Sequence, residues 1–69
     1  MLDRIDKAII RLLLKYKQKY LSTNEIAKKV QISPLTAKRH LTKLEEEGFV
    51  SFRTVGAIRE YSRKKRKNG

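Results

Sequence analysis

The sequence predicts an α+β fold in which three helices are followed by a two-stranded β-hairpin. Two observations predict it. Apolar residues recur at helical spacing as far as Glu47, and after Gly48 the chain changes to the β-rich segment FVSFRTVGAIREYS. The chain has 69 residues, the size of one small domain, so we expect residues 1–62 to form it and 63–69 to be a basic, flexible tail.

The first helix is expected from Leu2 to about Lys17. Asp3 is a candidate N-cap, and Asp6, three residues later, gives a weak form of the capping box. One face is expected to join the core, and it carries Ile5, Ile9, Leu12, Leu13 and Tyr16. Ile10 and Leu14 point to nearly the opposite side, and we interpret them as a homodimer interface. The alternative is that so hydrophobic a helix lies centrally in the fold.

The next segment has the pattern of a helix-turn-helix unit. Ser22 and Glu25 match the S-x-x-E capping box, so a short helix is expected from Thr23 to about Val30. Its buried residues are expected to be Ile26, Ala27 and Val30. The turn 31–33 then leads into a further helix, and two helices joined by three or four residues form this unit.

The third helix, Pro34 to Glu47, organises the chain. Ser33 is a good N-cap, proline suits the first helical position, and Gly48 supplies the left-handed residue that ends a helix. The apolar stripe consists of Ala37, Leu41 and Leu44. The residues that point outward are Leu35, Thr36, Arg39, Thr42 and Lys43, with Lys38 on the flank, so apart from Leu35 this face carries short polar and basic side chains. A projecting face of this kind suits a DNA major groove.

The hairpin is expected to pair Phe49 to Thr54 with Ile58 to Ser62 across the tip Val55-Gly56-Ala57. Gly56 is the residue expected to take a positive φ at the tip. A two-stranded hairpin is marginal alone, so it should pack on the helices, with Leu21 adding a minimal third strand. The packing residues are expected to be Val50, Phe52 and Tyr61.

Composition and charge exclude several function classes. Eighteen Lys plus Arg against seven Asp plus Glu give a net charge of +11, which favours polyanionic partners. The sequence has no cysteine, no glycine-rich phosphate loop and no nucleophile paired with a base. We therefore predict a non-enzyme without cofactor or metal. No apolar run approaches the roughly 20 residues of a membrane span, so a cytoplasmic location is expected.

The only histidine and the two N-terminal aspartates have simple interpretations. His40 lies at the border of the buried face of the third helix and is expected to be a packed or partly exposed side chain. Asp3 and Asp6 lie one turn apart, and helix capping explains them without a cation.

Several motifs resemble known regulators. LDxID at the start, EIAKKV, ISPLTAKRH and LEEEGFV resemble the DNA-binding half of the leucine-responsive (Lrp/AsnC) family of prokaryotic regulators. LEEEGFVSFRTVGAIREYS resembles the wing of arsenic-repressor (ArsR) type regulators. The resemblance implies a winged helix-turn-helix domain similar to small regulators of archaea and their viruses. The effector domain of the first family and the cysteines of metal-sensing repressors are absent, so no small-molecule effector is expected.

By position, the resemblance implies that the third helix faces the major groove of double-stranded DNA. The residues carried over are Ser33, Leu35, Thr36, Lys38, Arg39, Thr42 and Lys43. Arg39 is expected to read guanine, and Leu35 and the Thr36 methyl to touch a thymine methyl. Ser33, Thr42 and Lys43 are expected to contact phosphates.

The hairpin and the tail extend the implied site. Arg53 and Arg59 flank the hairpin tip and are expected to approach the adjacent minor groove or its phosphates. Lys64 and Lys65 in the tail are expected to follow the DNA backbone, although the tail is equally interpreted as a solubilising end.

The sequence thus predicts a dimeric, sequence-specific regulator of transcription that binds an inverted repeat. Two alternatives remain open. One is an RNA-binding winged helix, which the lack of aromatic residues on the projecting helix face disfavours. The other is a protein-docking module that uses Ile10 and Leu14.

Overall fold

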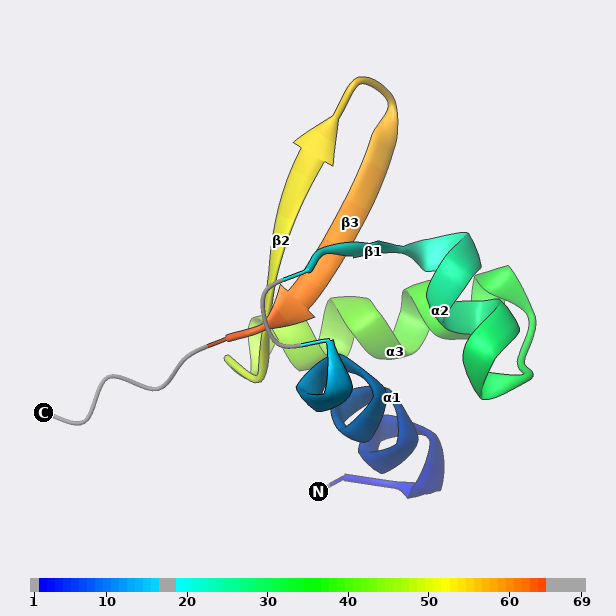
Figure 1. The fold of residues 1–69 in the computed structure, drawn as a ribbon. Coiled ribbons are helices and arrows are strands. Elements are labelled where there is room, and N and C mark those ends of the chain that lie inside the picture. Colours follow the sequence, from blue (N-terminus) through cyan, green and yellow to red (C-terminus); the bar gives the residue numbers. More distant parts are fainter. Residues whose placement is uncertain (1, 17–18, 65–69) are drawn as a thin grey trace, which may run out of the picture.

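The structure, a computed structural model, describes residues 2–16 and 19–64. Three helices are followed by a long antiparallel hairpin that projects beyond them, as predicted (Figure 1). The elements in chain order are α1 (Arg4–Lys15), β1 (Leu21–Ser22), α2 (Thr23–Val30), α3 (Pro34–Glu46), β2 (Val50–Val55) and β3 (Ile58–Arg63).

Helix α1 begins at Arg4, two residues later than predicted, because a complete capping box precedes it. The Asp3 carboxylate accepts from the Asp6 N–H (2.8 Å), and the Asp6 carboxylate accepts from the Asp3 N–H (3.1 Å). These bonds satisfy two of the donors left unpaired at a helix start. Lys17, where the prediction ended the helix, lies outside the described residues.

The helix-turn-helix unit starts each of its helices on a serine hydroxyl. Ser22 Oγ accepts from the Glu25 N–H and Ser33 Oγ accepts from the Thr36 N–H, both at 3.1 Å. Between the helices, Gln31 takes the left-handed conformation, with φ of 64°. A non-glycine residue adopts this conformation at a modest cost, so the turn closes without glycine. Both predicted helix starts are confirmed.

The sheet has the strand order β1-β3-β2, and all its pairs are antiparallel. Val55 pairs with Ile58, which leaves a two-residue turn whose Gly56 has the predicted positive φ, +61°. Leu21 pairs with Tyr61 and forms the expected minimal third strand. Strand β3 extends to Arg63, one residue into the segment predicted as tail.

The core lies between α3 and the other two helices, and residues of the sheet close it. The buried apolar residues are Ile9, Leu13, Leu21, Ile26, Ala27, Ala37, Leu41, Leu44, Val50 and Tyr61. Phe52 was predicted to pack on the helices, but it lies further along the projecting hairpin and is 39% exposed.

The predicted outward direction of Ile10 is wrong, because this side chain is half-buried and packs against the core. Helix α1 contacts α2, α3 and β3, so a wider sector of its surface is covered than the sequence pattern indicated. Leu14 is 42% exposed. The apolar surface that α1 leaves uncovered on this side is therefore smaller than expected.

Candidate nucleic-acid interface

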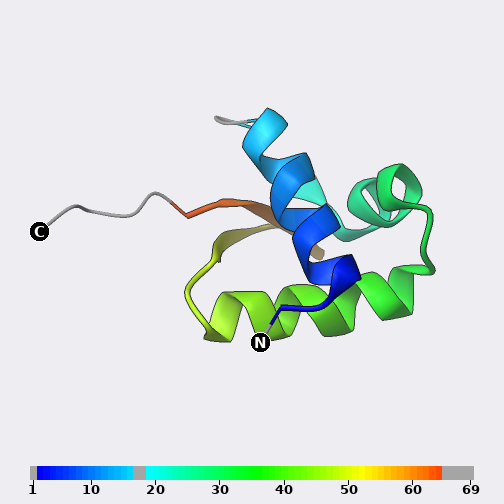
Figure 2. The ribbon, with the colours of Figure 1, turned by 90° about the horizontal axis from the view of Figure 1, so that it is seen from below.

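Helix α3 is anchored on one side and exposed on the other. Ala37, Leu41 and Leu44 are completely buried. On the other side Lys38 and Arg39 are exposed, and Leu35 keeps 61% of its surface accessible, a high value for a large apolar side chain. Figure 2 shows α3 along one edge of the molecule, with α1 crossing it on the inner side. The predicted inner face is confirmed, and of the residues predicted to face outward or flank that face, Leu35, Lys38 and Arg39 are exposed.

The first turn of α3 uses its hydroxyl groups internally. The Ser33 hydroxyl accepts from the Thr36 N–H and donates to Thr36 Oγ1 at 2.8 Å. Ser33 is exposed, whereas Thr36 and Thr42 are half-buried. The single hydroxyl proton of Ser33 is therefore engaged within the protein, and the Thr36 proton remains as a donor.

The prediction that Lys43 points outward is wrong. Its Nζ lies 2.6 Å from Oδ2 of Asp6, whose side chain is completely buried. Nδ1 of His40 lies 2.7 Å from the other Asp6 oxygen. Since a carboxylate only accepts hydrogen bonds, both α3 residues donate to it. Lys43 lies at the edge of the outer face, and its long side chain reaches back to α1. The expected border position of His40 is confirmed, with 18% of its side chain exposed.

Two side chains and one backbone N–H keep Asp6 ionised. Burial alone would raise the pKa of Asp6, but the hydrogen bonds from Lys43, His40 and the Asp3 N–H outweigh burial, and the pKa lies below its ordinary 3.8. The same contact with Asp6 raises the pKa of Lys43 above 10.5. The cluster is therefore an ion pair at neutral pH, and it joins α3 to the N-terminus of α1.

Asp3, Asp6 and His40 also offer ligand atoms within 4.8 Å of one another, an arrangement that resembles a cation site. Both oxygens of Asp6 are already engaged, one by His40 and the other by Lys43 and the Asp3 N–H. A metal ion bound through Nδ1 of His40 would have to displace the proton with which this nitrogen donates to Asp6. The capping box and the ion pair account for the cluster without a metal.

A depression of about 530 Å³ lies between the start of α3 and the tip of the hairpin. Leu35 and Lys38 line it from α3, and Ile58 and Arg59 line it from β3. The structure thus brings together predicted site residues that are more than 20 positions apart in the sequence. Leu35 and Ile58 are both more than half exposed and give the depression an apolar part between two cations.

The two hairpin arginines lie on opposite faces of the sheet. Arg53 pairs with Glu60 across the strands, and Arg59 is the neighbour of Glu60, so their side chains alternate. Nε of Arg53 donates to Oε1 of Glu60 at 2.8 Å, and its guanidinium lies 4.4 Å from the centre of the Tyr20 ring. Only Arg59 of the two therefore lines the depression beside α3.

Arg59 is held in place by an aromatic ring. Its guanidinium carbon lies 4.1 Å from the centre of the Phe52 ring. Lys64 is exposed just beyond β3, and its N–H donates to the Phe49 carbonyl at 3.2 Å. Lys65, the other tail residue of the predicted site, lies outside the described residues.

The predicted site lacked Ile58 of the hairpin and three residues at the start of α2, Ser22, Thr23 and Asn24, which also line the depression. A signal was present in the sequence, because Ser22 was already identified as the N-cap of this helix. The first residues after an N-cap carry unpaired N–H groups, which attract anions such as phosphate.

Comparison with known families gives one match, which covers residues 2–51. The matching family is described as winged helix-turn-helix DNA-binding. No curated protein matches the chain.

Among solved structures, the ferric uptake regulator from Francisella tularensis with iron matches with a TM-score of 0.84 at 19% sequence identity. The match covers 99% of this chain and 56% of the regulator's chain. The S. aureus MepR-DNA complex matches with a TM-score of 0.84 at 18% identity, over 91% of this chain and 53% of the MepR chain. NolR from Sinorhizobium fredii matches with a TM-score of 0.78 at 25% identity, over 94% of this chain and 62% of the NolR chain. The chain therefore spans little more than half the length of these proteins.

Proposed function

The chain belongs to the winged helix-turn-helix DNA-binding family, and on this premise we propose that it regulates transcription by inserting α3 into the major groove of specific duplex sequences. The observation that carries the proposal is the outer face of α3, which is exposed and basic while the opposite face is fixed in the core. A DNA-binding role implies a location inside the cell, which we include in the proposal.

Direct reading of bases is assigned to the middle of this face. Arg39 is exposed and can donate two hydrogen bonds to guanine O6 and N7. Leu35 offers an apolar surface for a thymine methyl group, and the Thr36 methyl is placed one residue further along. These three residues would set the sequence preference.

Contacts with phosphate are assigned to the rim of the face. Lys38 lines the depression beside the hairpin. The Thr36 hydroxyl accepts a hydrogen bond from Ser33, so its own proton can be donated to a phosphate. At Ser33 the contact falls to the N–H of Leu35, because Pro34 has no N–H and the Thr36 N–H donates to Ser33 Oγ, and Thr42 contributes from the middle of the helix. Lys43 leaves the proposed contact set, because its ammonium group is paired with Asp6.

The hairpin and the residues beyond it extend the proposed footprint. Arg59, held over Phe52 beside the depression, would approach the phosphates or the minor groove next to α3. Arg53 would contribute less, because Glu60 neutralises it on the other face. Lys64 would meet the backbone further along the duplex, and Lys65 is proposed to do the same.

We further propose that two copies form a dimer. The exposed Leu14 and the accessible part of the half-buried Ile10 would lie in the contact between them. The small core of the chain and the exposed leucine support this assembly. Two α3 helices related by a two-fold axis would then enter major grooves about 34 Å apart. Leu14→Glu should give a monomer in sedimentation and weaken binding to an inverted repeat. Unchanged sedimentation of a dimer would exclude this interface.

Selection of bound sequences from random duplexes tests the proposed function. The proposal predicts enrichment of a defined half-site, and a palindromic pair of half-sites if the dimer is correct. A competition between the selected duplex and a structured RNA at about 150 mM salt provides the control. Failure to enrich any sequence, or stronger binding to the RNA, would contradict specific DNA recognition.

A further inference from the structure

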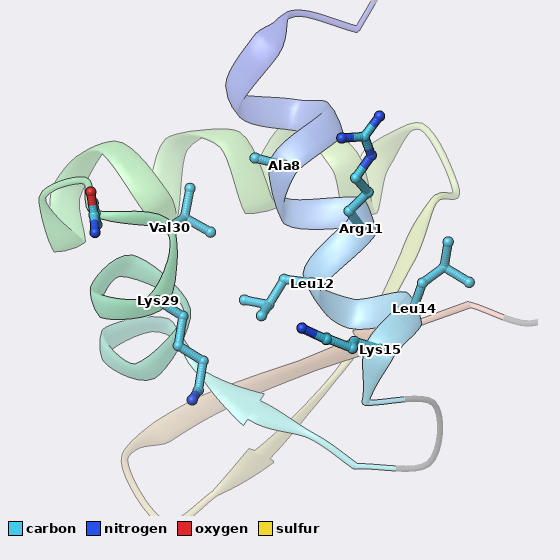
Figure 3. Close-up of a pocket in the computed structure, with 8 residues that line it drawn as sticks. Ala8, Arg11, Leu12, Leu14, Lys15, Lys29 and Val30 are labelled. Atoms are coloured by element: carbon cyan, nitrogen blue, oxygen red, sulfur yellow. The ribbon is translucent and has the colours of Figure 1, made fainter.

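A shallow groove between α1 and α2 forms a second candidate binding surface. Its volume is about 750 Å³. Ala8 and Leu12 of α1 and Val30 of α2 form the apolar floor, and Arg11, Lys15 and Lys29 surround it. Figure 3 shows Leu12 directed toward α2, with Val30 and Lys29 on the opposite wall. The groove therefore combines an apolar floor with a basic rim.

The floor is accessible although it adjoins the core. Leu12 and Val30 are half-buried and pack against the buried cluster with one side, which leaves the other side open to the groove. Ala8 adds a small side chain and so leaves space beside Leu12. An apolar strip of this kind between two helices is the surface on which an amphipathic helix packs.

The rim is strongly basic and unneutralised. Arg11, Lys15 and Lys29 are exposed, and none of them has an ion-pair partner among residues 2–16 and 19–64. Lys29 Nζ lies 5.4 Å from the centre of the Tyr16 ring, which places its ammonium near the end of α1. Arg4 and Lys7 continue the basic stripe along α1 into an adjoining hollow.

We propose that this groove binds an acidic amphipathic helix of a partner protein. The apolar side of that helix would cover Leu12 and Val30, and its carboxylates would meet Arg11, Lys15 and Lys29. Helix α1 has 12 residues, which corresponds to about 18 Å, so the groove fits roughly three turns of a bound helix.

Charge complementarity selects this occupant over the others. A second copy of the chain carries a net charge of +11, and its α1 and α2 present basic side chains to solvent, so a copy that contacts Leu14 at the edge of the groove would not neutralise the rim. The chain's own segment 63–67 consists of arginine and lysine alone, so it cannot neutralise the rim. Duplex DNA would match the cations but offers the apolar floor only a charged backbone. An acidic amphipathic helix satisfies both features.

The groove is separate from the proposed DNA interface. No described residue of α3, β2 or β3 lines it, and in Figure 3 α3 passes behind α1. Leu14, the residue of the proposed dimer contact, also lines the groove, although in Figure 3 its side chain points away from Leu12, so the dimer contact would adjoin the groove. The partner helix would thus bind while α3 occupies DNA, which would let the protein recruit an acidic protein to a DNA site.

Fluorescence anisotropy with a designed peptide tests the proposal. The probe is a labelled helix of about 14 residues, with leucines at positions i, i+3, i+4 and i+7 and glutamates elsewhere. The full chain should bind it with a micromolar Kd, and Lys15→Glu with Lys29→Glu should weaken binding at least about tenfold. The matched control, Lys19→Glu with Lys28→Glu, changes the same charge at exposed lysines outside the groove and should weaken binding less than about threefold.

Three results would overturn the proposal. Equal weakening by the two double variants would mean that net charge alone attracts the peptide. Equal binding of a probe whose leucines are replaced by serine would remove the role of the apolar floor. A larger loss of duplex affinity in the groove variant than in the control would assign the surface to DNA. Circular dichroism of each variant verifies that it is folded.

Discussion

The two faces of α3 differ in how many of their side chains are buried or bonded to other parts of the protein. On the inner face Ala37, Leu41 and Leu44 are buried, and His40 and Lys43 donate to the buried carboxylate of Asp6. On the outer face Arg39 and Lys38 project from the same helix into solvent. Because the inner side of the helix holds α3 in place, the outer face can carry charges that contribute little to stability and are available for a ligand.

The largest expected effect is on the inner face. Asp6→Ala should lower the free energy of unfolding by about 2–3 kcal/mol, because His40 and Lys43 lose their acceptor and α1 loses half of its capping box. The figure is below that for a fully buried pair, because the Lys43 side chain is 39% exposed and solvent screens it.

Urea denaturation measures this loss, and Asp3→Ala is the control. That variant removes the N-cap and the longer contact of Asp3 with His40 (3.8 Å) but leaves Asp6 bonded to His40 and Lys43, and it should cost about 1 kcal/mol. If the two variants were equally stable, the connection between α1 and α3 through Asp6 would contribute nothing.

The next effect is on the outer face. Arg39→Ala should reduce the preference for the selected duplex over a scrambled one by about 1–3 kcal/mol. Its free energy of unfolding should change by less than about 0.5 kcal/mol, because the side chain is exposed. Binding titrations and urea denaturation of the same variant separate the two effects. A stability loss as large as that of Asp6→Ala would contradict the difference between the faces.

A smaller effect distinguishes two lysines of the same helix. Lys38→Ala should lower the salt dependence of duplex binding by about one unit of the log–log slope, because a phosphate contact is lost. Lys43→Ala should leave the slope unchanged and destabilise the fold, since its ammonium is paired with Asp6. Equal slopes for Lys38→Ala and the unmodified protein would remove Lys38 from the interface.

The smallest expected effect is a change in the pH dependence of stability. The pKa of Asp6 is lowered in the folded state, so its contribution is complete above its ordinary value of 3.8 and is lost as the pH falls below it. The pKa of Lys43 is raised, so its contribution is lost as the pH rises above 10.5. Asp6→Asn should therefore flatten both ends of the curve measured by thermal unfolding. Unaltered slopes at both ends would contradict the assigned ion pair.

Local signals in the sequence predicted the parts of this fold that local bonds determine. Ser22 and Ser33 start their helices, and Gly48 and Gly56 take positive φ, as their neighbours alone indicated. The role of Asp6 was recognised only in part. Its capping bonds lie within one helical turn, whereas its contact with His40 joins residues 34 positions apart. Such a contact depends on how α1 crosses α3, and no pattern within a short stretch of sequence predicts that crossing.

The candidate site shows the same limit. The angular position of Lys43 placed it outward, but a long side chain at the edge of a face can turn back to a buried acid. The separation of Arg53 from Arg59 follows from the strand register, which depends on the two-residue turn at Gly56. The meeting of Leu35 with Arg59 at one depression required the hairpin to be placed against α3.

Amide chemical-shift mapping during titration with the selected duplex tests the central claim most directly. We expect the largest shift changes at Leu35, Lys38 and Arg39, with Arg59 of the hairpin, and small changes at the amides of α1. Large changes along α1 at Arg4 and Arg11, with the outer face of α3 unaffected, would contradict it.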